Sequence, residues 1–115
     1  MAVKCFEELV AWQKAQDLAV TVYETFSSCK DFGFRDQICE AAVSISNNIA
    51  EGFDRSSNAE FTRFLWYALG SCSEVKSMVY LGARIKVIQA IQKDSLLAEC
   101  VEVSKVITGL RKAVQ

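Results

Sequence analysis

Apolar residues recur at alternating spacings of three and four along most of this chain, and no proline interrupts them. Such spacing gathers apolar side chains on one face of an α-helix. A strand-rich fold has little support, because the chain shows neither sustained two-residue alternation nor an Asn-Gly hairpin signal. The sequence therefore predicts an all-α protein.

Four helical segments can be distinguished. The first ends near residues 27–30 and is expected to face the core with Leu9, Trp12, Gln16, Ala19, Tyr23 and Phe26. A turn at residues 31–33 leads to a second segment, whose start is weakly capped and whose buried face is expected to hold Ile38, Ala41, Ala42, Ile45, Ile49 and Gly52. Both stripes have the period of a core-facing helix.

The third and fourth segments show the same period. Residues 57–60 (SNAE) fit a capping box that opens the third helix, which is expected to continue to about Ile88 and to bury Phe61, Phe64, Leu65, Ala68, Cys72, Val75, Val79 and Gly82. Gly70 and Gly82 inside it each cost about 1 kcal/mol relative to alanine, so we expect close helix packing at both. The last helix is expected to start at Asp94 or Ser95 and to bury Leu96, Cys100, Val103, Ile107, Leu110 and Val114.

The length of 115 residues describes a single domain, residues 1–115, with one core. Short links between helices of similar length favour antiparallel neighbours. The expected architecture is an antiparallel up-and-down four-helix bundle. Charge interrupts every apolar stretch before the roughly 20 residues of a membrane span, and the N-terminal MAVKCFEELV lacks the apolar run of a signal peptide. We therefore expect a cytoplasmic protein with no membrane segment.

The chain contains no histidine, the commonest general base and metal ligand. Its cysteines are odd in number and form no CxxC motif, which favours reduced thiols that fill core space: Cys5, Cys29, Cys39, Cys72 and Cys100. Carboxylate di-metal bundles use Glu-x-x-His motifs, which this chain cannot form. The sequence therefore predicts no catalytic residue, no metal and no cofactor.

Two long runs, AAVSISNNIAEGFDR and EFTRFLWYALGSCSEV, follow one another after an early LVAWQKA. Together they resemble the signature of the bacterial four-helix bundle proteins, also called the S23 or 23S rRNA intervening-sequence protein family. The resemblance covers nearly the whole chain. Two positions depart from it: Ser46 stands where relatives often carry proline, and residues 83–86 (ARIK) replace a usual Leu-Gly-Tyr-like turn.

The resemblance implies a bundle that assembles as a homo-oligomeric ring, with homopentamers known among relatives. Some relatives are encoded inside inserts of large-subunit ribosomal RNA genes. Relatives associated with diversity-generating retroelements are accessory proteins of a reverse transcriptase and bind nucleic acid through basic surfaces. A nucleic-acid or ribonucleoprotein partner is therefore an implied alternative.

Polar residues gather in and around the second and third segments, where helical spacing can bring several together: Asn48, Glu51, Arg55, Glu60, Ser71 and Glu74. A structural interpretation is favoured, with Glu51 and Arg55 as an i,i+4 pair, Glu60 as a capping residue and Asn48 bonded to a neighbouring helix. A ligand or partner site at the same cluster is the alternative.

Charge is distributed unevenly along the chain. Residues 1–57 hold five basic and nine acidic groups, a net −4, and residues 58–115 hold eight and five, a net +3. The second half supplies a candidate basic patch: Arg63, Lys76, Arg84, Lys86, Lys105, Arg111 and Lys112. The patch suits nucleic acid, although a total charge of −1 argues against strong nonspecific binding. We favour the other interpretation, in which the acidic face of one subunit meets the basic face of the next.

Four large aromatic residues are candidates for that contact, although aromatic residues at helical spacing more often belong to the core: Trp12, Trp66, Tyr67 and Tyr80. Trp66 and Tyr67 follow core-like Leu65 directly, so at least one of them must point away from the bundle centre. The sequence as a whole indicates a non-enzymatic oligomeric helical scaffold or interaction protein. A nucleic-acid-binding or reverse-transcriptase accessory protein is the alternative.

Overall fold

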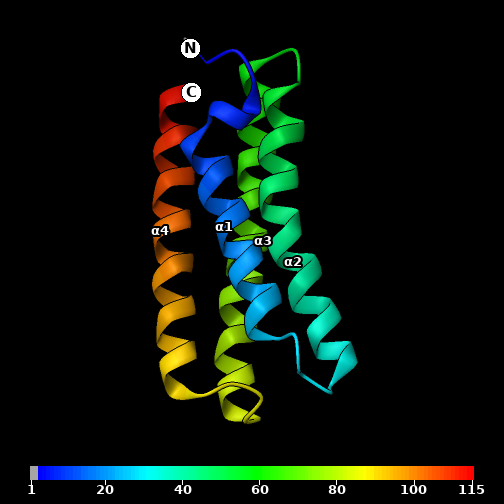
Figure 1. The fold of residues 1–115 in the computed structure, drawn as a ribbon. Coiled ribbons are helices and arrows are strands. Elements are labelled where there is room, and N and C mark those ends of the chain that lie inside the picture. The colour runs from blue at the N-terminus through cyan, green and yellow to red at the C-terminus, as the bar shows by residue number, and fades with distance from the viewer. Residues whose placement is uncertain (1–2) are drawn as a thin grey trace.

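The computed structural model describes residues 3–115 and consists of helices joined by short turns (Figure 1). A 3-10 helix, η1 (Phe6–Glu8), precedes α1 (Val10–Thr25), α2 (Phe32–Phe53), α3 (Asn58–Arg84) and α4 (Ala90–Val114). Successive helices run in opposite directions, and α4 returns beside α1 (Figure 1). No strand occurs in the described part of the chain. The prediction of an all-α protein with four helices is confirmed.

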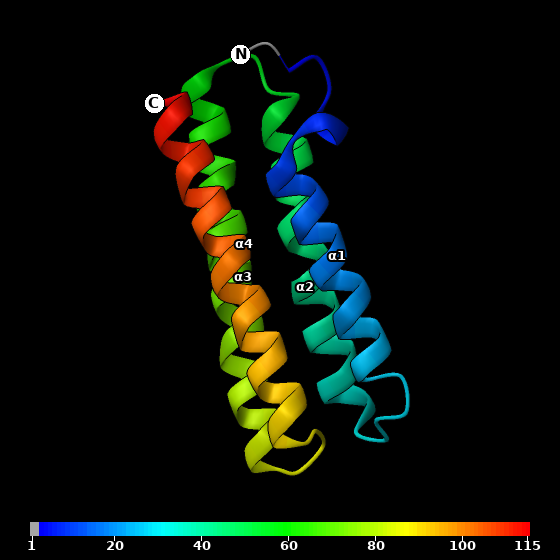
Figure 2. The ribbon, with the colours of Figure 1, turned by 60° about the vertical axis from the view of Figure 1, so that its left-hand side comes forward.

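The molecule is an elongated bundle of 43 × 22 × 19 Å. Figure 2 shows α1 and α2 as one antiparallel pair and α3 and α4 as the other. Each helix contacts its neighbours around the bundle, and the buried residues of all four form one hydrophobic cluster between the pairs. The stripes predicted for the second and third segments are all buried, and that of the fourth is buried except for Leu110, which is partly exposed.

The stripe predicted for the first helix is partly wrong. Gln16 and Tyr23 are exposed, whereas Ala15, Leu18 and Val22 are completely buried. Small residues on this face let α1 approach its neighbours closely, so alanine takes places that the larger side chains were expected to fill. The amide of Gln16 instead donates a hydrogen bond to Ser46 Oγ of α2 at 2.9 Å.

The second helix begins earlier than predicted and is properly capped. Phe32 and Gly33 are already helical, and the Asp31 carboxylate accepts a hydrogen bond from the backbone N–H of Phe34 at 3.1 Å. An aspartate in this position satisfies one of the amides that the first turn leaves free. The expected turn at residues 31–33 is therefore reduced to the capping residue.

The third helix ends at Arg84, short of the predicted Ile88. The Lys86 N–H donates to Ala83 O at 3.2 Å and the Val87 N–H to Gly82 O at 3.0 Å, the pattern of a Schellman motif. Lys86 has a φ of 65°, the left-handed conformation that this motif requires. Glycine usually occupies this position. Because residues 83–86 (ARIK) contain no glycine, the sequence did not indicate that α3 ends here.

The fourth helix begins at Ala90, four residues before the predicted start at Asp94. The Gln92 side chain accepts a hydrogen bond from the Gln89 N–H at 2.8 Å, which supports the first turn. Glutamine is not a preferred capping residue, so the sequence gave a weaker start signal here than at Asp94 or Ser95.

The two glycines inside α3 differ. A Cβ on Gly82 would lie 3.2 Å from Phe34 Cζ, so the predicted close packing is confirmed there. A Cβ on Gly70 would meet no atom within 4 Å, and the same holds for Gly109 in α4. The prediction of close packing within the bundle is wrong for Gly70. The tightest approach is at Gly52, where a Cβ would lie 2.6 Å from Phe64 Cβ.

Among residues 3–115, no helix combines the length and the apolar character that crossing a membrane requires.

Candidate functional site

The six residues of the predicted polar cluster do not form one site. Asn48 and Ser71 meet through Ser44: the Asn48 amide donates to Ser44 O and Oγ at 2.8 and 3.0 Å, and Ser44 and Ser71 share a hydrogen bond of 2.9 Å. This partly buried network joins α2 to α3. Asn48 was expected to bond a neighbouring helix, but it bonds its own helix, and Ser44 makes the crossing.

The other members of the cluster lie apart from this network. Glu74 accepts a hydrogen bond from Gln37 at 3.4 Å, further along the same α2–α3 seam. The Glu60 backbone N–H donates to Ser57 Oγ at 3.2 Å, which is the Ser57 half of the predicted capping box. The Glu60 carboxylate pairs with Arg63 at 2.7 Å, and no bond to it from the Ser57 N–H is found among residues 3–115, so the capping role predicted for the Glu60 side chain is wrong.

The predicted ion pair between Glu51 and Arg55 is absent from the described residues. Arg55 follows the end of α2, so the i,i+4 geometry of a continuous helix does not apply to it. Its guanidinium lies 4.7 Å from the centre of the Phe64 ring instead. Glu51 is exposed and lines a surface depression together with Tyr23 and Glu40.

The structure divides the predicted basic patch into three parts. Lys76, Lys105 and Lys112 line an open groove of about 440 Å³ between α3 and α4, together with Val101, Ser104, Thr108 and Gly109. We call these seven residues the α3–α4 groove. None of its lysines takes part in the ion pairs found among residues 3–115. Arg84 and Lys86 lie at the far end of α3, by the turn into α4.

Arginines at the other end of α3 stack on aromatic rings. Arg111 lies 4.3 Å from the Trp66 ring centre, and its Nε finds no hydrogen-bond acceptor in the described part of the chain. Arg63 lies 5.7 Å from the Tyr67 ring centre. Such contacts hold a guanidinium flat against a ring in partly exposed positions. Arg63 and Arg111 are thus fixed by contacts within the chain, while the groove lysines are not.

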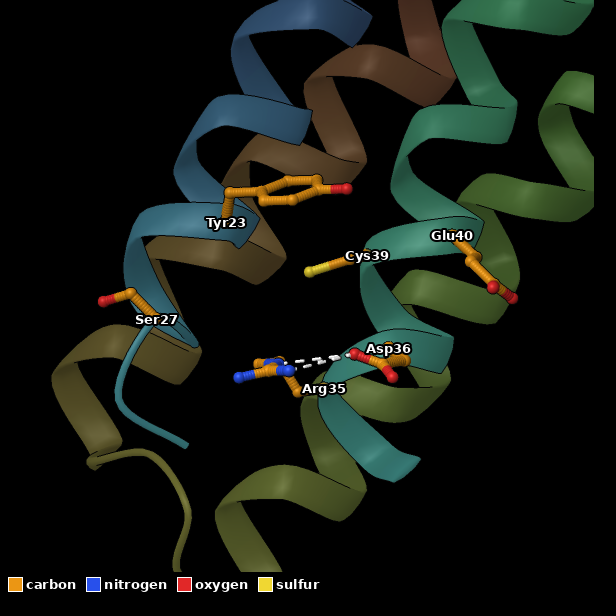
Figure 3. A pocket seen from close by; sticks show the side chains of 6 residues that line it. All are labelled: Tyr23, Ser27, Arg35, Asp36, Cys39 and Glu40. Atoms are coloured by element: carbon orange, nitrogen blue, oxygen red, sulfur yellow. Dashed lines mark hydrogen bonds and ion pairs between the residues drawn. The ribbon is translucent and has the colours of Figure 1, made fainter. Parts of the chain in front are cut away.

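Sequence reasoning missed a hollow between α1 and α2. The part of the hollow near the end of α1 has a volume of about 390 Å³ (Figure 3). It is lined by Tyr23 of α1, by Ser27 just after that helix, and by four residues of α2: Arg35, Asp36, Cys39 and Glu40. Figure 3 shows the Cys39 thiol directed toward α1 and the Glu40 carboxylate turned outward. A second depression of about 440 Å³ shares Tyr23 and Glu40 and continues along α2 past Asn47 to Glu51.

We call the two depressions together the α1–α2 hollow. The hollow is acidic, because its lining contains three carboxylates, Asp36, Glu40 and Glu51, and one cationic side chain. That cation, Arg35, pairs with Asp36 at 3.3 Å. No signal in the sequence marked the hollow. Tyr23, which was interpreted as a core residue, is 54% exposed and forms one wall.

Several large side chains of α3 are exposed. Trp66, Tyr67 and Leu81 are each about half exposed, at 53%, 47% and 48%. The prediction that at least one of Trp66 and Tyr67 points away from the core is confirmed for both. Tyr80 is also exposed, whereas Trp12 is partly buried against Phe6. Surface tryptophan and tyrosine close to arginine have the composition of protein contact sites.

All five cysteines are free, and Cys39, Cys72 and Cys100 are buried. Ser104 donates a hydrogen bond to Cys72 Sγ at 3.2 Å, and Cys72 donates to Cys100 O at 3.4 Å. The contact with Cys72 and burial raise the pKa of the Cys100 thiol. These two thiols fill space between α3 and α4. Within residues 3–115, no group of three or more Cys, Asp or Glu side chains is arranged to hold a metal ion.

A family of known proteins and several solved structures match this chain. The model of the 23S rRNA-intervening sequence protein family matches residues 7–109. Among solved structures, a protein with unknown function from the S23 ribosomal protein family of Bacteroides thetaiotaomicron VPI-5482 superimposes with a TM-score of 0.83 and 27% sequence identity. The match covers 90% of this chain and 99% of that one. No curated protein matches the chain by sequence.

Proposed function

We propose that this chain, which belongs to the 23S rRNA-intervening sequence protein family, is a non-enzymatic helical protein that binds copies of itself and serves as a scaffold or interaction partner. The observation that carries the proposal is the outer face of α3, where large apolar side chains remain about half exposed in the isolated chain. Burying them in a subunit contact removes apolar surface from water, at about 25 cal/mol per Å².

The split in charge supports the same proposal. Carboxylates line the α1–α2 hollow and free lysines line the α3–α4 groove, on different sides of the bundle. Surfaces of opposite charge on one subunit favour a head-to-tail contact, which repeats from copy to copy and closes as a ring. Titratable groups elsewhere on the bundle already have structural partners, as in the pairs of Glu60 with Arg63 and of Lys14 with Glu102.

Light scattering coupled to size exclusion, at low and high salt, tests the proposal. We expect an oligomer of about five subunits, the number that the family resemblance implies, with a mass that does not change with salt. We expect this salt resistance because burial of apolar surface, unlike attraction between exposed charges, is not screened by salt. A monomer at both salt concentrations would contradict the proposal.

A second candidate function, nucleic-acid binding, is favoured by one observation: the lysines of the α3–α4 groove have no ion-pair partner among residues 3–115. Fluorescence anisotropy of a labelled single-stranded RNA across a salt series tests it. Each of the changes Lys76→Gln, Lys105→Gln and Lys112→Gln should reduce the salt slope by about 0.7, the value for one lost phosphate contact on a single strand. Salt-independent or undetectable binding would exclude this candidate.

A further inference from the structure

The exposed side of α3 carries a stripe of its own, separate from the one that faces the core. Trp66, Gly70, Ser73, Ser77 and Leu81 follow one another at spacings of four, three, four and four residues. We call these five residues the α3 outer face. All are exposed, with the large side chains at the two ends and small ones in between. A helix with this outline has a shallow depression halfway along its surface.

Gly70 at the centre of that depression has no explanation within the chain. A glycine inside a helix costs about 1 kcal/mol relative to alanine. Gly52 and Gly82 are needed because a Cβ at either would crowd a phenylalanine, whereas a Cβ at Gly70 would meet nothing within 4 Å. The lack of a side chain at Gly70 lets a second molecule approach the α3 backbone closely.

The α1–α2 hollow has the complementary charge. Its carboxylates Glu40 and Glu51 take part in none of the ion pairs found among residues 3–115. On the other side of the bundle, Lys76 and Arg84 flank the α3 outer face and are equally unpaired there. Opposite charges on two surfaces of one chain suit contact between copies better than contact with an unrelated anion or cation.

The heights of these groups along the bundle also agree. Contacts between α2 and α3 fix their register: Phe34 lies beside Gly82, Ser44 beside Ser71, and Gly52 beside Phe64. This register places Glu40 nearly level with Lys76, and Asn47 nearly level with Gly70. Copies related by rotation about an axis parallel to the helices meet at equal heights. Such a contact therefore brings Lys76 of one copy close to Glu40 of the next.

We infer that the α3 outer face of one copy docks into the α1–α2 hollow of a second copy. The inference rests on the proposed self-association and assigns it a surface. Trp66 and Leu81 supply the buried apolar area, and the α3 backbone at Gly70 approaches the rim of the hollow near Asn47. Lys76, at the edge of the α3 outer face, meets Glu40 of the hollow, which fixes the register of the contact.

The test compares two exposed helical positions. Gly70→Arg places a long side chain in the centre of the α3 outer face, and Ser95→Arg places the same side chain on α4, at a residue that belongs neither to the α1–α2 hollow nor to the α3–α4 groove. Arginine is a better helix former than glycine or serine, so both proteins should fold, which circular dichroism verifies. We expect Gly70→Arg to weaken self-association about 100-fold, a loss typical of a disrupted interface centre, and Ser95→Arg to leave it unchanged.

Exchange of charges adds a second readout. Glu40→Lys and Lys76→Glu should each lower the association constant, and the double variant should restore most of it. A wild-type protein that is monomeric overturns both the proposed function and this inference. An oligomer that withstands Gly70→Arg, or that dissociates with Ser95→Arg but not with Gly70→Arg, overturns the inference and leaves the proposed function intact.

Discussion

Glycine has opposite structural roles at the α2–α3 seam and on the α3 outer face. At the α2–α3 seam, Gly52 lies under Phe64 and Gly82 lies against Phe34, so the absence of a side chain sets the distance between helices. On the outer face, Gly70 has open space around it, between exposed Trp66 and Leu81. The seam is already filled by this chain, while the outer face is the surface on which we propose that a second copy docks. The same residue type therefore gives different responses to mutation on the two sides.

The largest effect is expected at the seam. In Gly52→Ala the new methyl group would lie 2.6 Å from Phe64 Cβ, an atom that cannot move without its helix. Forcing an extra carbon into a packed contact should lower the free energy of unfolding by about 3 kcal/mol. Urea denaturation measures this loss. A change below about 0.5 kcal/mol would show that α2 and α3 can move apart at little cost. It would contradict the claim that Gly52 sets the distance between them.

The hydrogen-bond network of the same seam should contribute less. Ser71→Ala removes the bond that Ser71 shares with Ser44 across the two helices, but Ser44 keeps its contact with Asn48. We expect a loss of about 1 kcal/mol in the free energy of unfolding, the usual net value of one partly buried hydrogen bond. The control is Ser73→Ala on the outer face, which should stay within about 0.5 kcal/mol of the wild type.

The outer glycines should respond with the opposite sign. Gly109→Ala adds a methyl group to open space and should raise the free energy of unfolding by about 0.8 kcal/mol through helix propensity alone. Gly70→Ala should give the same gain when measured at a protein concentration low enough for the chain to be monomeric. A loss of stability at either position, seen as a lower midpoint of thermal unfolding, would contradict the open environment.

The smallest effect belongs to the seam between α1 and α4. The Lys14 ammonium donates to Glu102 Oε1 at 2.6 Å; this contact lowers the pKa of the Glu102 carboxyl and raises that of Lys14. The stabilisation from Glu102 is therefore present above its ordinary pKa of 4.5 and is lost as the pH falls through the lowered value. Because the pair is exposed, the effect is small and screened by salt.

Thermal unfolding midpoints of Glu102→Gln and of the wild type, measured across a pH series, test the stabilisation expected from this pair. The variant should be slightly less stable than the wild type at pH 7, and the two should converge in acid. Equal pH profiles would show that this pair does not stabilise the contact between α1 and α4.

Much of the fold followed from local pattern. The three-and-four spacing identified Ile45, Leu65 and Ile107 as core residues, because one apolar stripe can be satisfied only by facing the other helices. The pattern was less informative where a signal was atypical. Lys86 occupies a left-handed position that glycine usually marks, so the end of α3 was placed too late. In α1, buried alanines were given less weight than Gln16 and Tyr23, which are exposed.

The candidate sites were predicted less completely, because residue spacing reports neighbours on one helix and not across helices. Arg55 could be assigned to Glu51 only on the assumption that α2 continues, whereas the helix ends and the guanidinium stacks on Phe64. Lys76, on α3, joins Lys105 and Lys112, on α4, only because two antiparallel helices place distant parts of the chain side by side. The α1–α2 hollow likewise combines residues from two helices that no motif connects.

By itself, the sequence determined the all-helical class, the number of helices, the family and most of the core, since each depends on periodic burial or on contiguous motifs. The tertiary structure decided which polar and charged groups share a surface. That outcome depends on the rotation and register of each helix against its neighbours, which are set by packing at positions such as Gly52 under Phe64 and Gly82 against Phe34. A rotation of one residue around a helix moves a side chain by about 100°, enough to transfer Tyr23 from the core to the wall of a hollow.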